Sequence, residues 1–176
     1  MISSKEGAGA LQRAADAGVE SAVFEASAHP GRNDRDREMA AWLRERGVDL
    51  VVLAGYMELL TPGFLRAFPG RVINVHPTLL PAFPGARPIE DQLAYGAKVG
   101  GVTVHFVDEG VDSGPIILQQ AVDLPYTRGK EEVLELLHRI EHELLPRAIR
   151  LIARDAVRID PDNPRIVHVE DSALDD

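Results

Sequence analysis

The sequence predicts an α/β fold: an open, mostly parallel twisted sheet with helices on both faces, followed by a C-terminal β-hairpin. Residues 50–54 form an uninterrupted apolar run, which is typical of a strand covered on both faces. Runs of this kind alternate along the chain with segments of helical spacing, which favours a largely parallel sheet. Near the C-terminus, two short strand-like runs flank the turn-forming residues 161–164 and indicate the hairpin.

In the first half of the chain, apolar spacing and stop signals define the expected elements. Gly47 is a good helix stop, and Thr61 followed by Pro62 suits the N-cap and first position of a helix. We expect the end of a strand over residues 1–4, a helix over 8–17, a strand over 21–24, a helix over 34–45, a strand over 50–54 and a short helix over 61–68.

The second half starts with a strand over residues 72–76, which ends in a loop held by prolines. We expect a helix over 89–95, strands over 102–107 and 115–122, a long helix over 130–153 that Pro146 bends, and hairpin strands over 157–159 and 165–169. The acidic residues 170–176 are expected to fray. A length of 176 residues predicts a single domain over residues 1–176.

Composition excludes several classes of function. The chain has a net charge of −9 and an isoelectric point near 5.1, which argues against a general nucleic-acid-binding surface. It has no cysteine, so disulfides and thiolate metal sites are excluded. No apolar run approaches the roughly 18 residues of a membrane span. We expect a cytoplasmic protein whose partners are neither nucleic acids nor membranes.

Chemically competent side chains follow two of the predicted strands. Asn74 and His76 are two residues apart on a strand, so their side chains point to the same face. Asp112 lies in the glycine-flanked loop 108–114, and it reaches the same sheet edge if the strands are parallel neighbours. A carboxylate beside an imidazole favours the imidazolium, and an imidazolium with an amide can stabilise an oxyanion in acyl transfer. Asp112 can also take a proton from the attacking group.

Other kinds of site are less favoured by the same residues. No hydroxyl or thiol in these loops is arranged as a nucleophile, so direct transfer between two bound substrates fits better than a covalent acyl-enzyme. His105 lies on a nearby strand, but the paired spacing of metal ligands is absent, and we expect no metal. His105 is interpreted as a packed or supporting residue. The apolar loop 56–60 is suited to cover a flat heterocycle, although it could equally be core.

Three segments carry a resemblance to a known family. They are NVHPTLLP at residues 74–81, VHFVDEGVDSGPII at 104–117 and LAGYM at 53–57, and AFPG at 82–85 adds to them. Together they resemble the folate-dependent formyltransferases, most closely those that act on glycinamide ribonucleotide in purine (IMP) biosynthesis. The resemblance runs from about Ile2 to about Arg158. It implies the formyltransferase-like form of the predicted sheet.

The resemblance also implies roles for individual residues. Asn74, His76 and Asp112 match the catalytic trio of the family. Its folate-binding segments correspond to Tyr56, Met57, Glu58, Leu59, Leu60, Val107, Asp108, Glu109, Gly110 and Val111. Arg32, Gly85 and Glu141 match positions that contact the ribonucleotide. The implied reaction moves a formyl group from 10-formyltetrahydrofolate, as co-substrate, to the amine of glycinamide ribonucleotide, in a monomer or a homodimer.

The chain departs from the family pattern at its start. Family members begin with a further strand and a Gly-Ser-Gly-type loop that binds the substrate phosphate, and Met1 falls where the second strand is already under way. We therefore expect an N-terminally truncated member with weakened ribonucleotide binding. Residues 86–91 and His138, where the family often has Gln, also differ.

Three alternatives stay open. One is a formyltetrahydrofolate hydrolase, although that enzyme typically has a second His where Pro77 stands. Another is a different formyltransferase, such as the methionyl-tRNA enzyme, which usually carries a further domain. The third is an inactive folate-binding homologue.

Overall fold

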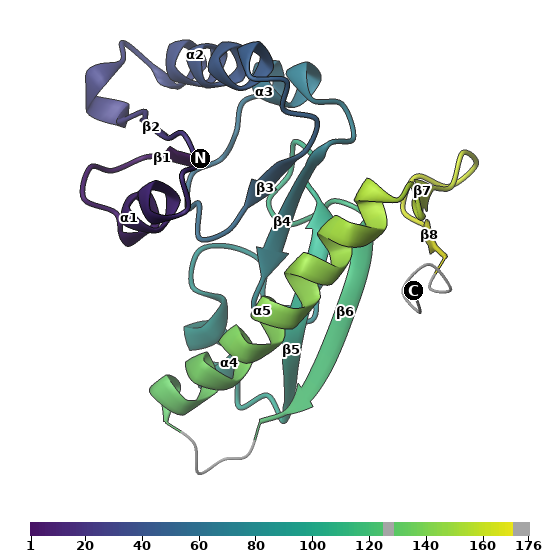
Figure 1. The fold of residues 1–176 in the computed structure, drawn as a ribbon. Helices are drawn as coiled ribbons and strands as arrows, with labels where there is room; N and C mark the ends of the chain where they lie inside the picture. The colour runs from purple at the N-terminus through teal and green to yellow at the C-terminus, as the bar shows by residue number, and fades with distance from the viewer. Residues whose placement is uncertain (125–128, 171–176) are drawn as a thin grey trace. The chain divides into compact units, whose positions relative to one another are not determined.

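The computed structural model of the protein describes residues 1–124 and 129–170 (Figure 1). The chain forms two compact units, and each is described by itself. The first comprises residues 1–51 and 58–69, and the second comprises residues 52–57 and 70–176. Within the described residues, no helix is long and apolar enough to cross a membrane.

The first unit combines a small parallel sheet with helices. Strand β1 (Ile2–Ser3) pairs in parallel with β2 (Ala22–Val23). Its helices are α1 (Gly9–Asp16), the 3₁₀ helix η1 (Ala26–Ala28), α2 (Arg32–Glu45) and α3 (Pro62–Ala67). Helix α3 starts as predicted, because the Thr61 hydroxyl oxygen accepts a hydrogen bond from the Phe64 N–H at 3.4 Å. The buried apolar side chains of the first unit include Met39, Leu43 and Phe64.

The second unit contains most of the main sheet, and the boundary between the units falls inside strand β3. The strand order is β3-β4-β5-β6. The strands are β3 (Val51–Leu53), β4 (Val72–His76), β5 (Val99–Phe106) and β6 (Ile116–Asp123), and the other elements are α4 (Pro88–Tyr95), α5 (Lys130–Ala153), β7 (Val157–Ile159) and β8 (Val167–Val169). Strands β7 and β8 form the predicted antiparallel hairpin.

Helix α5 covers β5 and β6 and closes the core of this unit (Figure 1). Its buried side chains recur every three or four residues, which places them on one face of the helix. They are Val133, Leu137, Ile140, Leu144, Ala148, Leu151 and Ile152. The helix continues through Pro146, where the sequence predicted a bend.

The α/β class and the flanking helices are confirmed, but strand direction varies. Strands β1 and β2 are parallel, whereas β4 and β5, and β5 and β6, are antiparallel. The register pairs Asn74 with His105 and His76 with Thr103. The end of β5 therefore lies beside the start of β4, and the expectation that the loops after these strands leave one sheet edge is wrong. The predicted tail, residues 170–176, lies outside the described residues apart from Glu170.

Candidate active site

Asn74 and His76 point to one face of β4, as their spacing predicts. The His76 side chain is 5% exposed. Its Nε2 donates to the carbonyl oxygen of Phe83 at 3.0 Å, and its Nδ1 lies 3.4 Å from Oδ2 of Asp112. Both ring nitrogens therefore face acceptor oxygens.

His105 lies beside Asn74 on β5 and fixes its amide. Its Nδ1 donates to the Phe106 carbonyl oxygen at 2.8 Å, which leaves the Nε2 lone pair to accept from the Asn74 amide nitrogen at 3.3 Å. Burial lowers the pKa of His105, and this effect exceeds the opposing effects of the Phe106 hydrogen bond and the Asp112 charge. His105 is thus a neutral acceptor that orients Asn74.

Asp112 reaches this site because its loop folds back over the sheet. Val107 still donates to the Val72 carbonyl oxygen, so the loop starts at the far end of β4 from His76. Four residues of strand span about 13 Å, so the Asp112 part of the loop has to lie back toward His76 before the chain returns to Phe106 at Gly114. The Asp112 carboxylate then lies 3.4 Å from His76 and 3.7 Å from Nε2 of His105. Asp112 and His76 therefore meet directly, and Asn74 lies beside them against His105, by a route that the sequence did not indicate.

The proline loop is held by buried hydroxyl groups that sequence reasoning missed. Thr103 donates to the Thr78 carbonyl oxygen at 2.7 Å and accepts from the Leu80 N–H at 3.1 Å. Thr78 donates to the Ala82 carbonyl oxygen at 2.7 Å, and both threonines are fully buried. Gln119 on β6 donates to the Leu80 carbonyl oxygen and to the Thr103 hydroxyl, each at 2.9 Å. The available signal was the alternation of side chains along β5, which puts Thr103 on the same face of the strand as His105.

Phe83 is a second residue that the sequence did not mark as functional. Its φ of 52° lies in the left-handed region, which is rare for a residue with a large side chain. This conformation belongs to the loop that brings the Phe83 carbonyl oxygen to His76. The role is carried by the backbone, so no residue type could have indicated it.

In the predicted folate segment of residues 107–111, the Asp108 side chain makes hydrogen bonds within its own loop. Oδ1 of Asp108 accepts from the Ser113 hydroxyl at 2.7 Å and from the Gly110 N–H at 3.0 Å. Glu109, Gly110 and Val111 are exposed. The side chains available to a ligand are therefore those at the loop tip, while Asp108 shapes the turn.

The other predicted folate segment spans both units. Tyr56 and Met57 belong to the second unit, and Met57 is 69% exposed. In the first unit, the Glu58 carboxylate pairs with the buried Arg35 guanidinium, Leu59 is 50% exposed and Leu60 is buried. Met57 in the second unit and Leu59 in the first are large apolar side chains that stay exposed.

The buried pair of Arg35 and Asp36 on α2 holds this segment at two points. Arg35 binds Glu58, and Asp36 accepts from the Thr61 N–H at 2.7 Å. Nε and Nη2 of Arg35 donate to Oδ1 of Asp36 at 3.3 and 3.1 Å, so the buried carboxylate is paired. The predicted substrate residue Arg32 is exposed at the start of the same helix.

The other two predicted substrate residues belong to the second unit. The Gly85 N–H donates to Oδ2 of Asp112 at 2.8 Å, so it positions the carboxylate. Glu141 is half-buried on α5, and burial raises its pKa against the opposing effects of His138, His142 and His76.

Metal ligation finds no support among residues 1–124 and 129–170. No group of three or more His, Asp or Glu side chains there could hold a metal ion.

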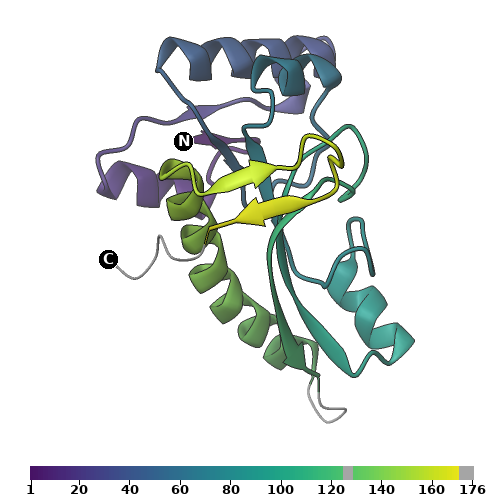
Figure 2. The same ribbon diagram turned by 90° about the vertical axis from the view of Figure 1, so that its right-hand side faces the viewer.

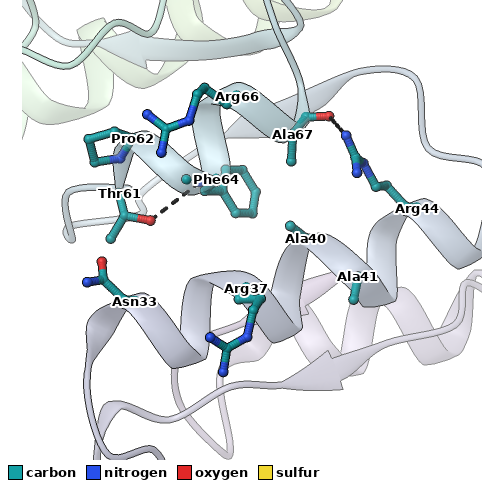
Figure 3. A pocket seen from close by; sticks show the side chains of 11 residues that line it. Asn33, Arg37, Ala40, Ala41, Arg44, Thr61, Pro62, Phe64, Arg66 and Ala67 are labelled. Carbon is teal, nitrogen blue, oxygen red and sulfur yellow. Dashed lines mark hydrogen bonds between the residues drawn. The ribbon is translucent and has the colours of Figure 1, made fainter.

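A pocket of about 640 Å³ lies between α2 and α3 in the first unit (Figure 3). Ala40 of α2 and Ala67 of α3 line it from opposite sides (Figure 3), and Arg37, Arg44 and Arg66 are also among its lining residues. Two of these cations have partners in the unit: Arg37 pairs with Asp34, and Arg44 donates to the Ala67 carbonyl oxygen. None of its lining residues is among the predicted site residues.

The chain is similar to solved and curated proteins over most of its length. The crystal structure of glycinamide ribonucleotide transformylase 1 from Symbiobacterium toebii superposes with a TM-score of 0.92 at 44% identity, covering 97% of this chain and 79% of that one. Phosphoribosylglycinamide formyltransferase from Bacillus subtilis is 37% identical over 150 residues, which are 85% of this chain and 77% of that protein.

A third relative is much longer than this chain. The trifunctional purine biosynthetic protein adenosine-3 of Drosophila melanogaster is 40% identical over 162 residues, which are 92% of this chain but only 12% of that protein. A family model described as formyl transferase matches residues 1–149, which extend through both compact units. This chain therefore belongs to the formyl transferase family.

Proposed function

We propose that the protein transfers a formyl group from 10-formyltetrahydrofolate to the amine of glycinamide ribonucleotide, a step of purine biosynthesis. The observation that carries the proposal is the connected cluster of Asn74, His105, Asp112 and His76 on the face of β4 and β5. Family membership and the names of the relatives from Bacillus subtilis and Symbiobacterium toebii support the choice of reaction.

Asn74 supplies the neutral donor for the reaction. Neutral His105 accepts one N–H of the Asn74 amide, so the second N–H is left to donate to the formyl oxygen. When the amine attacks the formyl carbon, this oxygen gains negative charge. An amide that is already oriented stabilises that charge without further reorganisation.

His76 and Asp112 supply charge and proton transfer. A charged His76 beside the reacting centre stabilises the oxyanion electrostatically, and Asp112 holds it at 3.4 Å. The amine nitrogen forms a bond to the formyl carbon, the bond from that carbon to N10 of the folate breaks, and N10 takes up the proton that Asp112 passes on from the amine. Asp112 accepts the proton that the amine loses, directly or through one water molecule.

The substrates are assigned to the remaining predicted residues. The exposed apolar side chains of Met57 and Leu59, with the loop tip 109–111, contact the pterin ring. Arg32 and Glu141 contact the ribonucleotide, and the half-buried carboxylate of Glu141 suits an amine. Gly85 contributes to the ribonucleotide site by holding the Asp112 carboxylate through its N–H.

The test is a transfer assay on the purified chain with both substrates. Formylated glycinamide ribonucleotide should appear together with tetrahydrofolate in equal amounts, and Asn74→Ala should lower turnover by about 100- to 1,000-fold. Release of free formate without an acceptor would instead indicate a hydrolase. Folate binding without either product would indicate a binding protein.

A further inference from the structure

A side chain from the C-terminal hairpin reaches the loop that carries Asp112. The Arg165 guanidinium, between β7 and β8, donates through Nη1 to the Ser113 carbonyl oxygen, 52 residues earlier in the chain. Both residues belong to the second unit, where β8 lies against β6 (Figure 2). The contact is therefore made to the residue that directly follows the candidate proton acceptor.

Asp112 has a backbone conformation that needs support. Its φ of 49° lies in the left-handed region, which is uncommon outside glycine, although Asp adopts it more readily than most residues. Such outliers persist where surrounding contacts hold them, and they concentrate at functional sites. The Gly85 N–H and His76 hold the Asp112 carboxylate directly, and the loop contacts hold the backbone that presents it.

Two contacts link the residues before Asp112 to those after it. The Ser113 hydroxyl donates to Asp108 within the loop. Gly114 passes so close to the Phe106 carbonyl oxygen that a Cβ there would collide with it. The Ser113 carbonyl oxygen, between these contacts, accepts a hydrogen bond from Arg165.

Arg165 is itself presented by an ordered turn. Oδ1 of Asp160 accepts from the N–H groups of Asp162 and Asn163 at 2.9 Å each. The Asn163 side chain in turn accepts from the Arg165 N–H at 3.1 Å. The other oxygen of Asp160 binds Nε2 of His168 on β8 at 2.7 Å, and this hydrogen bond lowers the pKa of Asp160. The backbone of Arg165 is thus held in a defined position by the turn.

We propose that Arg165 is a positioning residue, which holds the Asp112 loop so that the carboxylate faces His76. The proposal rests on the proposed function, because it assigns Asp112 to the transfer step. Arg165 touches neither substrate and acts only through Ser113. Because Arg165 is exposed, its removal should affect the site far more than the stability of the fold.

The experiment compares Arg165→Ala with Arg165→Lys and with Arg158→Ala in the full chain. Arg158 is an exposed arginine on β7 of the same hairpin and serves as the matched control. The first readout is hydrogen exchange of the Gly85 amide by NMR, because that N–H donates to Asp112 and reports its position without any catalysis. The second is kcat and KM for both substrates, with the melting temperature of each variant.

Arg165→Ala should speed Gly85 exchange by about 2- to 10-fold, the effect of one weakened hydrogen bond. Its kcat should fall by about 10- to 100-fold, because a displacement of about 1 Å at a catalytic group has this effect. Both KM values should stay near wild type. Arg165→Lys retains a cationic donor and should restore most of both readouts, and Arg158→Ala should change neither.

Unchanged Gly85 exchange in Arg165→Ala would overturn the proposal. So would faster exchange with unchanged kcat, or an equal loss of kcat in Arg158→Ala. If the wild-type chain transfers no formyl group, the proposed function fails, and Gly85 exchange alone then decides whether Arg165 holds Asp112.

Discussion

Replacing Asp112 by asparagine removes one charge from the candidate site and little else. The two side chains have nearly the same shape. The asparagine oxygen can still accept from the Gly85 N–H, which lies 2.8 Å from Oδ2 of Asp112 in the wild-type chain. What disappears is the negative charge 3.4 Å from Nδ1 of His76 and 3.7 Å from Nε2 of His105. The variant therefore tests the charge and the proton-accepting role together, in an unchanged fold.

The size of the effect follows from the distance. Two unit charges 3.4 Å apart interact by about 1 kcal/mol in water and about 5 kcal/mol at an effective dielectric constant of 20. The side chains of His76 and Asp112 are only 5% and 16% exposed, which places the pair nearer the second value. The loss of one preorganised electrostatic contact to a developing charge typically lowers kcat by about 100- to 1,000-fold, which is about 3–4 kcal/mol at about 1.36 kcal/mol per tenfold, and this is the loss we expect.

The assay measures kcat and both KM values by the absorbance change as the folate product forms. Asp123→Asn is the matched control, because Asp123 is an exposed carboxylate at the end of β6. KM for the folate should change little in Asp112→Asn, and its melting temperature should stay close to that of wild type. Wild-type turnover in Asp112→Asn would refute the reasoning. A loss of turnover matched in Asp123→Asn would refute it as well, because the effect would then not be specific to this carboxylate.

Three further variants test burial and charge elsewhere. Glu141→Gln should melt at a higher temperature than wild type at pH 7 and should bind the ribonucleotide more weakly. The raised pKa of Glu141 means that its charged form destabilises the folded state above about pH 4.5, so a lower melting temperature would contradict the reasoning. Arg35→Ala should lower the free energy of unfolding in urea by about 3–5 kcal/mol, because the fully buried Asp36 carboxylate loses its cationic partner. A loss below about 1 kcal/mol would show that Asp36 finds another partner. Gly101→Ala should cost about 1–3 kcal/mol, because the added Cβ meets the Gln120 carbonyl oxygen.

The pH dependence of stability has a definite sign at His105. Its folded pKa lies below the unfolded value near 6.5, so its stabilising effect is present above about pH 6.5 and is lost as pH falls toward the folded pKa. Urea unfolding between pH 8 and pH 5 should therefore show a steeper loss in wild type than in His105→Asn. Parallel curves for the two proteins would mean that His105 does not titrate as its burial predicts.

Local sequence signals determined most elements and part of the site. The 3.6-residue spacing in residues 130–153, the Thr61 cap and the two-residue spacing of Asn74 and His76 depend only on the nearest neighbours in the chain. Such signals are readable because the backbone geometry of helices and strands is the same in every fold. The motifs that carried the family resemblance follow the same logic, since they are short and contiguous.

The tertiary structure decided what lies far apart in sequence. Strand direction placed His105 opposite Asn74, and it required the 108–114 loop to fold back for Asp112 to reach His76. The roles of the Phe83 carbonyl oxygen, the Thr103 hydroxyl and the Arg165 guanidinium arise from contacts 7, 25 and 52 residues away in the chain. Residue type alone does not reveal such contacts, because a carbonyl group is present in every residue and its partner is chosen only when the strands pair.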